Sequence, residues 1–167
     1  NLDYIQPIPI AYFRHDNSYL LLRRSEESRK DRMHDKYVLW AGGHVRQQDA
    51  RNGNPIKKCL LREVSEELYI KELPEPILTG LMLDTSSIPS SCHLAVVHQF
   101  SIDHSDVAIS LDNKEFKERK GKSVSGSFIL ERDVENYFDK MEFWSKLLIV
   151  KHLKILDRPI SQQAILF

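Results

Sequence analysis

Residues 55–70 read Pro-Ile-Lys-Lys-Cys-Leu-Leu-Arg-Glu-Val-Ser-Glu-Glu-Leu-Tyr-Ile, and this stretch has the pattern of an amphipathic helix. Pro55 suits a first turn, where its missing N–H is not needed, and Asn54 before it is a favourable N-cap. Apolar residues then recur at helical spacing, at Ile56, Leu60, Leu61, Val64 and Leu68. The sequence therefore predicts a helix over 55–70 with one buried face.

Three carboxylates lie beside this apolar stripe, at Glu63, Glu66 and Glu67. Each like-charged pair one turn apart costs a few tenths of a kcal/mol. A solvated acidic face is the simpler interpretation of an isolated Glu-x-x-Glu-Glu pattern. The alternative is a hard divalent cation held among the three, because such ions prefer oxygen ligands. Arg62, one turn before Glu66, can orient a carboxylate through a charge-assisted hydrogen bond.

The segment before the helix favours the metal interpretation. Leu39-Trp40-Ala41-Gly42-Gly43-His44-Val45 is an apolar run with a Gly-Gly turn, and an acid follows at Asp49. With the helix it resembles the box of the Nudix hydrolases, written G-x5-E-x7-R-E-U-x-E-E-x-G-U with U aliphatic. The matching residues are Gly43 for the first glycine, Asp49 for the first acid, Arg62-Glu63-Val64-Ser65-Glu66-Glu67 for the core and Ile70 for the last aliphatic.

Three positions depart from this motif. The first acid is Asp rather than Glu. Twelve residues separate Asp49 from Arg62, against seven in the motif, and we expect the turn-rich run 51–55 to hold the five extra residues. Tyr69 stands at the second glycine, so the helix must end without the left-handed glycine that often terminates helices. None of the departures removes a core carboxylate.

The resemblance implies an α/β fold, a Nudix-type α/β/α sandwich with a mixed β-sheet. It also implies a pyrophosphohydrolase: hydrolysis of a nucleoside-diphosphate-linked small molecule by attack of water on phosphorus. The implied cofactor is Mg²⁺, with Mn²⁺ as an alternative. The implied metal ligands are the carboxylates of Glu63, Glu66 and Glu67 and the backbone carbonyl of Gly43. Arg62 completes the implied catalytic set by holding these carboxylates rather than touching substrate.

Further site residues are open. The family takes its general base from a box glutamate or from a late loop, so Glu115 and Glu118 are candidate loop acids, against a solvated charged loop. Arg24, at the end of an apolar strand, is a candidate substrate contact, against a surface arginine. His44 could meet substrate or bond its own loop, and Trp40 could stack a base.

The rest of the chain predicts a sheet between helical elements. Strands are expected over 4–14, 19–24, 37–41, 77–83, 93–102 and 126–130, with helical segments over 131–137 and 142–156. Pro7 and Pro9 suggest that the first half of the first strand lies at an edge, because neither can donate to a ladder. These elements predict one Nudix domain over residues 1–167.

The composition argues against nucleic acid and membranes as binding partners. With 41% hydrophobic and 29% charged residues the chain has the make-up of a globular protein, and 24 basic residues balance 24 acidic ones. No overall field therefore favours nucleic acid or an anionic membrane, and no apolar run approaches the roughly 18 residues of a membrane span. We expect Cys59 and Cys92 to be reduced thiols and the protein to be cytoplasmic. A homodimer is a further expectation, because dimers are common in the family.

Two other functions stay open. A non-catalytic Nudix-like module would bind a nucleotide and report it to a partner. Such modules usually lose core carboxylates, and this chain keeps all of them. Isopentenyl-diphosphate isomerase is a distant third, because it needs a cysteine near the Gly-His turn and residues 37–48 contain none. The Gly42-Gly43-His44 turn and the longer loop more closely resemble an uncharacterised group of predicted Nudix phosphoesterases.

Overall fold

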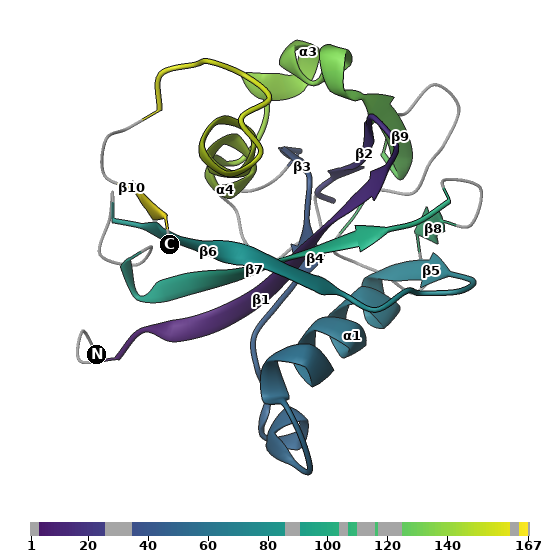
Figure 1. Ribbon diagram of the computed structural model, residues 1–167, viewed down its shortest axis with the longest axis vertical. Coiled ribbons are helices and arrows are strands. Elements are labelled where there is room, and N and C mark those ends of the chain that lie inside the picture. The colour runs from purple at the N-terminus through teal and green to yellow at the C-terminus, as the bar shows by residue number, and fades with distance from the viewer. Residues whose placement is uncertain are drawn as a thin grey trace.

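A mixed sheet of eight strands runs through the middle of the molecule (Figure 1). The computed structural model describes residues 4–25, 35–85, 91–103, 107–109, 116, 125–160 and 164–166. The strand order is β10-β6-β7-β1-β2-β3, with β4 paired to β1 and β9 paired to β2, while β5 and β8 form a separate two-stranded sheet. The strands are β1 (Gln6–His15), β2 (Ser18–Arg23), β3 (Tyr37–Val38), β4 (Ala41–Gly42), β5 (Leu68–Ile70), β6 (Ile77–Asp84), β7 (His93–Ser101), β8 (Val107–Ile109), β9 (Ser127–Leu130) and β10 (Ala164–Leu166).

Helices cover both faces of this sheet. The long helix α1 (Pro55–Glu67) lies on one face, and α3 (Glu135–Phe138) and α4 (Phe143–Leu147) lie on the other (Figure 1). Each face has its own buried apolar cluster: one contains Leu60 and Val64 of α1, and the other contains Leu147 of α4. The predicted α/β/α sandwich with a mixed sheet is confirmed.

Among the described strands, the first half of β1 pairs on one side only, as predicted for an edge position, since β4 and β2 join its other side from Ile10 onward. β1 pairs in parallel with β7 along its length, from Gln6 opposite His93 to Arg14 opposite Ser101. The prolines are compatible with this position because consecutive backbone N–H groups point to opposite sides of a strand. Gln6 donates to the carbonyl of Cys92 toward β7, and Pro9 presents its carbonyl on the other side, where Gly43 N–H donates to it at 3.2 Å.

Two predicted helices are shorter than expected. α1 ends at Glu67, because Leu68 has extended backbone and opens β5, which pairs with β8. The segment predicted over 142–156 is α4 followed by one π-helical turn, Leu148–His152. Lys154 then adopts a left-handed backbone with φ of 56°, which ends the helical path. The predicted helical turn after 131 is present as the 3-10 turn Glu131–Asp133 and α3.

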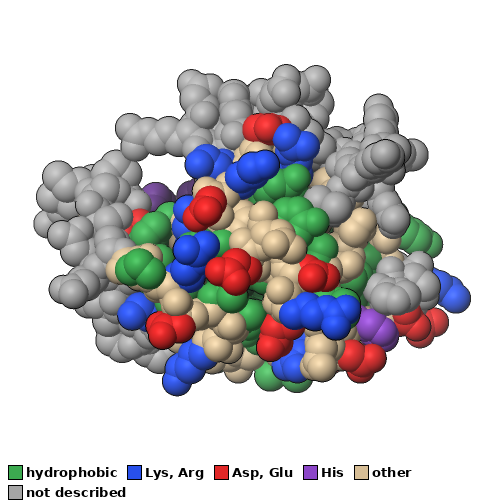
Figure 2. All heavy atoms as spheres, turned by 90° about the horizontal axis from the view of Figure 1, so that it is seen from above, with side chains coloured by type: hydrophobic (Ala, Val, Ile, Leu, Met, Phe, Trp, Pro, Cys, Tyr) green, Lys and Arg blue, Asp and Glu red, His purple; other side chains and the backbone are tan. Residues whose placement is uncertain are grey.

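The described surface carries charge of both signs. Figure 2 shows acidic and basic side chains interspersed over the face seen from above. Among the described residues, none of the helices combines the length and the apolar character that crossing a membrane would require.

Candidate functional site

The Gly42-Gly43 turn of the site is hydrogen-bonded to β1. Gly42 lies on β4, opposite Ile10, with φ of 147°. A Cβ on Gly42 would lie 2.2 Å from the carbonyl oxygen of Pro9, so a side chain cannot be placed there. The N–H of Gly42 donates to the Glu67 carboxylate at 3.3 Å, which joins this turn directly to α1.

Gly43 brings the backbone against a core carboxylate. A Cβ at this position would lie 2.6 Å from Cδ of Glu63, so the absence of a side chain makes the approach possible. The Gly43 carbonyl accepts a weak hydrogen bond from the Cys59 thiol, with 3.5 Å between sulfur and oxygen. The structure thus places the glycine of the box beside an acid of its core.

The apolar face of α1 packs against the sheet, and this packing fixes where the three core glutamates of the helix lie. Asn54 caps the helix, its side-chain oxygen accepting from the N–H groups of Ile56 and Lys57 at 2.9 and 3.2 Å. The glutamates then differ in depth. Glu63 and Glu67 are buried, and Glu66 is exposed.

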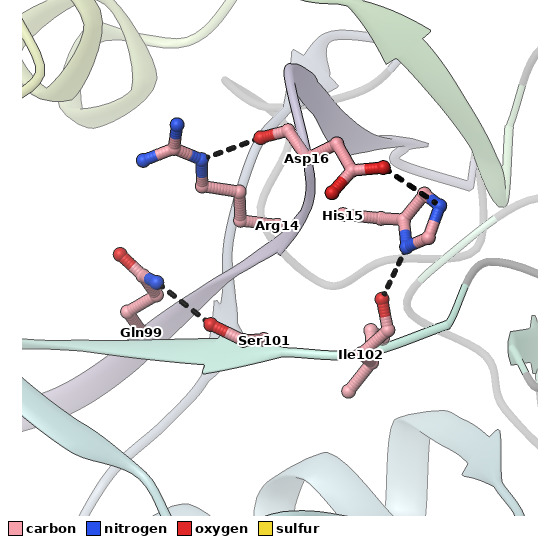
Figure 3. Close-up of a pocket in the computed structure, with 6 residues that line it drawn as sticks. All are labelled: Arg14, His15, Asp16, Gln99, Ser101 and Ile102. Atoms are coloured by element: carbon pink, nitrogen blue, oxygen red, sulfur yellow. Dashed lines mark hydrogen bonds and ion pairs between the residues drawn. The ribbon is translucent and has the colours of Figure 1, made fainter.

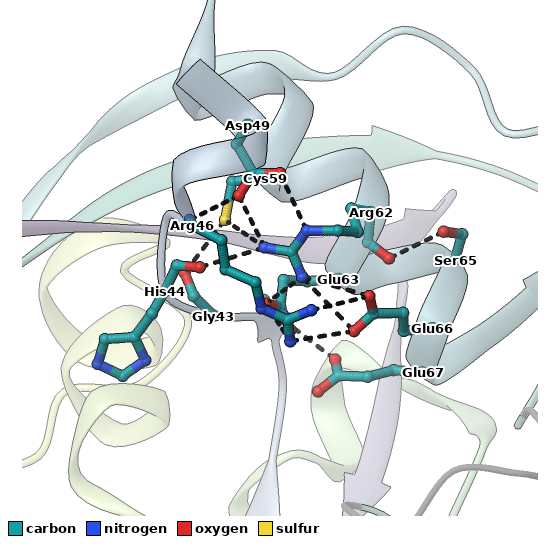
Figure 4. A network of polar contacts seen from close by, with 11 residues as sticks. Gly43, His44, Arg46, Asp49, Cys59, Arg62, Glu63, Ser65, Glu66 and Glu67 are labelled. Carbon is teal, nitrogen blue, oxygen red and sulfur yellow. Dashed lines mark hydrogen bonds and ion pairs between the residues drawn. The ribbon is translucent and has the colours of Figure 1, made fainter. Parts of the chain in front are cut away.

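Arg62 ties the acids together (Figure 4). Its Nε and Nη2 donate to the two oxygens of Asp49 at 3.0 and 2.8 Å, and its Nη1 donates to Glu63 at 2.6 Å. Nη1 also lies 3.4 Å from Glu66, and Nη2 donates to the carbonyl of His44. The longer spacing between Asp49 and Arg62 therefore leaves the acid and the arginine paired.

These contacts shift the acid–base equilibria. Hydrogen bonding from Arg62 lowers the pKa of Asp49 to about 2. The same bond raises the pKa of Arg62 further above its ordinary value. Burial raises the pKa of the Cys59 thiol to about 12, so that it stays protonated at neutral pH. Asp49, Arg62 and Cys59 are thus held in fixed charge states at physiological pH.

Arg46 belongs to this network and was not predicted from the sequence. Its guanidinium forms a fork on Glu66, with Nη1 3.2 Å and Nη2 3.4 Å from the two carboxylate oxygens, and Nη2 lies 3.6 Å from Glu63. Its side chain is 52% exposed. The available signal was a basic residue within the box itself, between Gly43 and Asp49.

The donor chemistry of the cluster fits a hard divalent cation. Carboxylate oxygens and backbone carbonyls are the kind of ligand that Mg²⁺ binds. In this arrangement arginines hold the oxygens of Glu63 and Glu66, and Gly42 N–H donates to Glu67. Within the described part of the chain, no three His, Cys, Asp or Glu groups are close enough together to hold an ion.

Arg24 and Trp40 lie in the interior. Arg24 is 3% exposed, and its guanidinium carbon lies 4.5 Å from the ring centre of Phe116 and 5.1 Å from that of Trp40. Trp40 is 5% exposed, and its indole N–H donates to Glu142 at 2.8 Å. Both side chains are thus engaged with protein partners, and the substrate contacts predicted for them stay predictions.

His44 is exposed beside the site. Its ring meets that of His93 edge-on, with 5.6 Å between ring centres. In Figure 4 the imidazole points away from the carboxylates. The candidate loop acids Glu115 and Glu118 lie outside the described residues.

A separate hollow of about 350 Å³ lies where β1 and β7 end (Figure 3). It is lined by Arg14, His15, Asp16, Gln99, Ser101 and Ile102. Its polar groups are partly engaged, since Arg14 donates to the backbone of Asp16 and Gln99 donates to Ser101. None of the box residues lines it.

Known proteins resemble this chain in sequence and in fold. No family model matches the sequence. Protein YmaB of Bacillus subtilis (strain 168) is 24% identical over 148 residues, which cover 86% of this chain and 69% of that protein. Tm1382, provisionally described as a Nudix hydrolase, has a TM-score of 0.68 at 24% identity, over 91% of this chain and 72% of that one.

Two further structures carry the same fold. The MutT protein of Methanosarcina mazei Go1 has a TM-score of 0.50 at 27% identity, over 71% of this chain and 77% of that one. A bifunctional NMN adenylyltransferase/ADP ribose pyrophosphatase of Francisella tularensis, solved with AMP and a Mn ion, has a TM-score of 0.55 at 18% identity, over 90% and 41%. The chain thus has the fold of the Nudix hydrolases, and its box residues gather on α1 and the turn before it.

Proposed function

We propose that this protein is a divalent-metal-dependent hydrolase that cleaves the diphosphate of a nucleoside-diphosphate-linked small molecule. The observation that carries the proposal is the meeting of Glu63 and Glu67 with the backbone of the Gly42-Gly43 turn, while Arg46 and Arg62 join Glu66 to Glu63. Four carboxylates and two guanidinium groups make up this network, so its formal charge is −2. That charge suits a divalent cation and does not suit direct binding of an anion.

The carboxylates of Glu63, Glu66 and Glu67, with the carbonyl of Gly43, would hold Mg²⁺ or Mn²⁺. Such an ion, when bound, neutralises phosphate charge and lowers the pKa of a bound water. Arg62 would act as a positioning residue. Its hydrogen bonds to Asp49 and Glu63 hold these carboxylates in place, and we expect it to make no contact with the substrate.

The reaction we propose is attack of water on phosphorus. A bond forms between the water oxygen and one phosphorus, and the bond from that phosphorus to the bridging oxygen breaks. A carboxylate of the chain accepts the proton that the water loses, and the bridging oxygen leaves with the second phosphate. The general base is one of the core glutamates or a loop acid.

The comparisons support the hydrolase class through the descriptions of the matched proteins. Tm1382 and the M. mazei protein have the same fold, and the F. tularensis protein is described as an ADP ribose pyrophosphatase and contains Mn. The substrate proposed here comes from the chemistry of the box. Assembly as a homodimer, and the absence of nucleic-acid and membrane partners, stay predictions.

A ligand-sensing module is the second candidate. The observation that favours it is the pairing of Glu66 with both Arg46 and Arg62, which leaves the site closed by ion pairs. A module of this kind would bind a nucleotide without turning it over.

Hydrolysis of a substrate panel tests the two candidates. The panel comprises ADP-ribose, dinucleoside polyphosphates, NADH, nucleoside triphosphates and nucleotide sugars, each with Mg²⁺. We expect turnover of at least one compound and a loss of about a hundredfold or more in Glu67→Gln, since removing one transition-state charge partner commonly costs that much. Glu72→Gln, at an exposed glutamate five positions further on, is the matched control and should keep full activity.

Full activity in Glu67→Gln would contradict the assigned site. Tight binding of one compound without turnover, in a folded wild-type protein, would favour the sensing module. The side-chain amide oxygen that Glu67→Gln introduces can still accept from Gly42 N–H, so the variant preserves the contact that joins the turn to α1.

A further inference from the structure

Two arginines neutralise the core acids, and they are held very differently. The Arg62 side chain is 15% exposed and bonds Asp49 through two nitrogens as well as Glu63 and a backbone carbonyl. The Arg46 side chain is 52% exposed, and its ion pairs with described residues are those to Glu66 and Glu63. Arg62 is therefore fixed in place, and Arg46 is free to move at low cost, because exposed ion pairs contribute about 0–1 kcal/mol.

The backbone of Arg46 is anchored even though its side chain is not. Its N–H donates to Asp49 at 2.7 Å, and Asp49 is in turn held by Arg62. A change of side-chain rotamer would therefore carry the guanidinium off Glu66 without disturbing the loop. The loop backbone is therefore fixed, and the Arg46 side chain can change its position.

The guanidinium stands on the oxygens that a divalent cation would need. Both oxygens of Glu66 face the Arg46 fork, and Oε1 of Glu63 lies 3.6 Å from Nη2. A guanidinium and a metal ion are both cations, so an ion bound to both oxygens of Glu66 would be strongly repelled by a guanidinium that forks on the same two oxygens. The arrangement thus makes the two occupants mutually exclusive.

We propose that Arg46 is an exchangeable counter-cation of the candidate site. It neutralises Glu66 and Glu63 while no divalent cation is bound, and it is displaced when the ion arrives. The released guanidinium then lies at the edge of the site and donates to the diphosphate of the substrate, for which arginine's planar fork is well suited. The second half of this proposal rests on the proposed function, and the first half does not.

Metal binding by the unliganded protein tests the exchange without any substrate. Mn²⁺ is titrated into metal-free protein, and free Mn²⁺ is measured by electron paramagnetic resonance. We expect Arg46→Gln to bind Mn²⁺ about tenfold more tightly than the wild type, within the range usual for coupling between two binding events. The matched control is Arg51→Gln, which removes the same charge from an exposed arginine of the neighbouring turn and should bind as the wild type does.

Equal or weaker Mn²⁺ binding in Arg46→Gln would overturn the exchange. An equal gain in Mn²⁺ affinity in both variants would overturn it as well, because the gain would then come from the loss of any nearby positive charge. These outcomes do not depend on catalysis, so a wild type that hydrolyses nothing would leave the test of the exchange intact.

Binding of a diphosphate mimic tests the second half. Methylenediphosphonate is titrated calorimetrically into each protein at saturating Mg²⁺. We expect Arg46→Gln to bind it about tenfold more weakly than the wild type and Arg51→Gln to bind it equally well. Equal affinity in wild type and Arg46→Gln would show that the released arginine does not contact the diphosphate, and this half would fall.

Discussion

At the scale of single residues, Asp49 acts through Arg62. Its two oxygens accept from Nε and Nη2 of Arg62, and Oδ2 also accepts from the N–H of Arg46. The first acid of the box thus supports the arginine that holds Glu63. Aspartate can fill this position because the 3-10 turn Gln47–Ala50 brings it within reach despite the long connection to the helix.

Acid titration should reveal this role. The pKa of Asp49 is lowered to about 2 from an ordinary value of 3.8, so its carboxylate stabilises the fold above about pH 4. That contribution is lost as the pH falls from about 4 toward 2. We therefore expect the difference in unfolding free energy between wild type and Asp49→Asn to shrink over this range. Urea unfolding of both proteins at a series of pH values measures the difference, and a constant difference would contradict the assignment.

At the scale of elements, the sequence marks the start of α1 clearly, with Asn54 and Pro55, but no glycine marks its end. Tyr69, where the motif has glycine, is tolerated because the chain does not turn back in a left-handed conformation. Leu68 is extended instead, with φ of −129°, and its N–H still bonds the carbonyl of Val64. Residues 68–70 then pair with β8, so their backbone groups are hydrogen-bonded in a strand pair. No helix-ending glycine is needed to reverse the chain.

The start of α1 depends on Asn54, and removing its cap should be measurable. Asn54→Ala leaves the N–H groups of Ile56 and Lys57 without their side-chain acceptor, at a cost of about 1 kcal/mol. We expect the melting temperature to fall by about 2–4 °C, as is typical for a domain of this size. Asn54→Asp, which keeps an acceptor, should melt close to the wild type. A melting temperature unchanged in the alanine variant would show that the cap adds nothing.

The sequence predicted the parts of the site that depend on local chemistry. The capped helix and the pairing of Arg62 with a neighbouring acid follow from residue type and spacing, whereas the place of Gly43 in the site was implied by the resemblance to the Nudix box. It missed Arg46, because that side chain reaches Glu66 only after the turn and α1 have packed together. It did not indicate the burial of Trp40 and Arg24 for a similar reason, since their partners at the start of α4 and at Phe116 are distant in the sequence. The Nudix branch stays a prediction.

At the scale of the whole molecule, the candidate site joins two segments that both pack on β1. The Gly42-Gly43 turn is hydrogen-bonded to Pro9 of β1, and α1 packs its apolar residues into the cluster that includes Ala11 and Phe13 of the same strand. A cation bound between the turn and α1 would therefore tie two layers of the fold together. Such a ligand binds the folded state and has no comparable site in the unfolded chain.

Addition of Mg²⁺ should stabilise the entire fold. A ligand at a hundred times its dissociation constant adds about 2.7 kcal/mol, which corresponds to a rise of about 5–10 °C in melting temperature for a domain of this size. Glu67→Gln should show a clearly smaller rise, because one of the predicted ligands has lost its charge. Sodium chloride at matched ionic strength controls for screening, and chelation with EDTA should reverse the effect. If the wild type melts at the same temperature with and without saturating Mg²⁺, the acids of α1 do not form a metal site, and the ion pairs of Arg46 and Arg62 are their permanent partners.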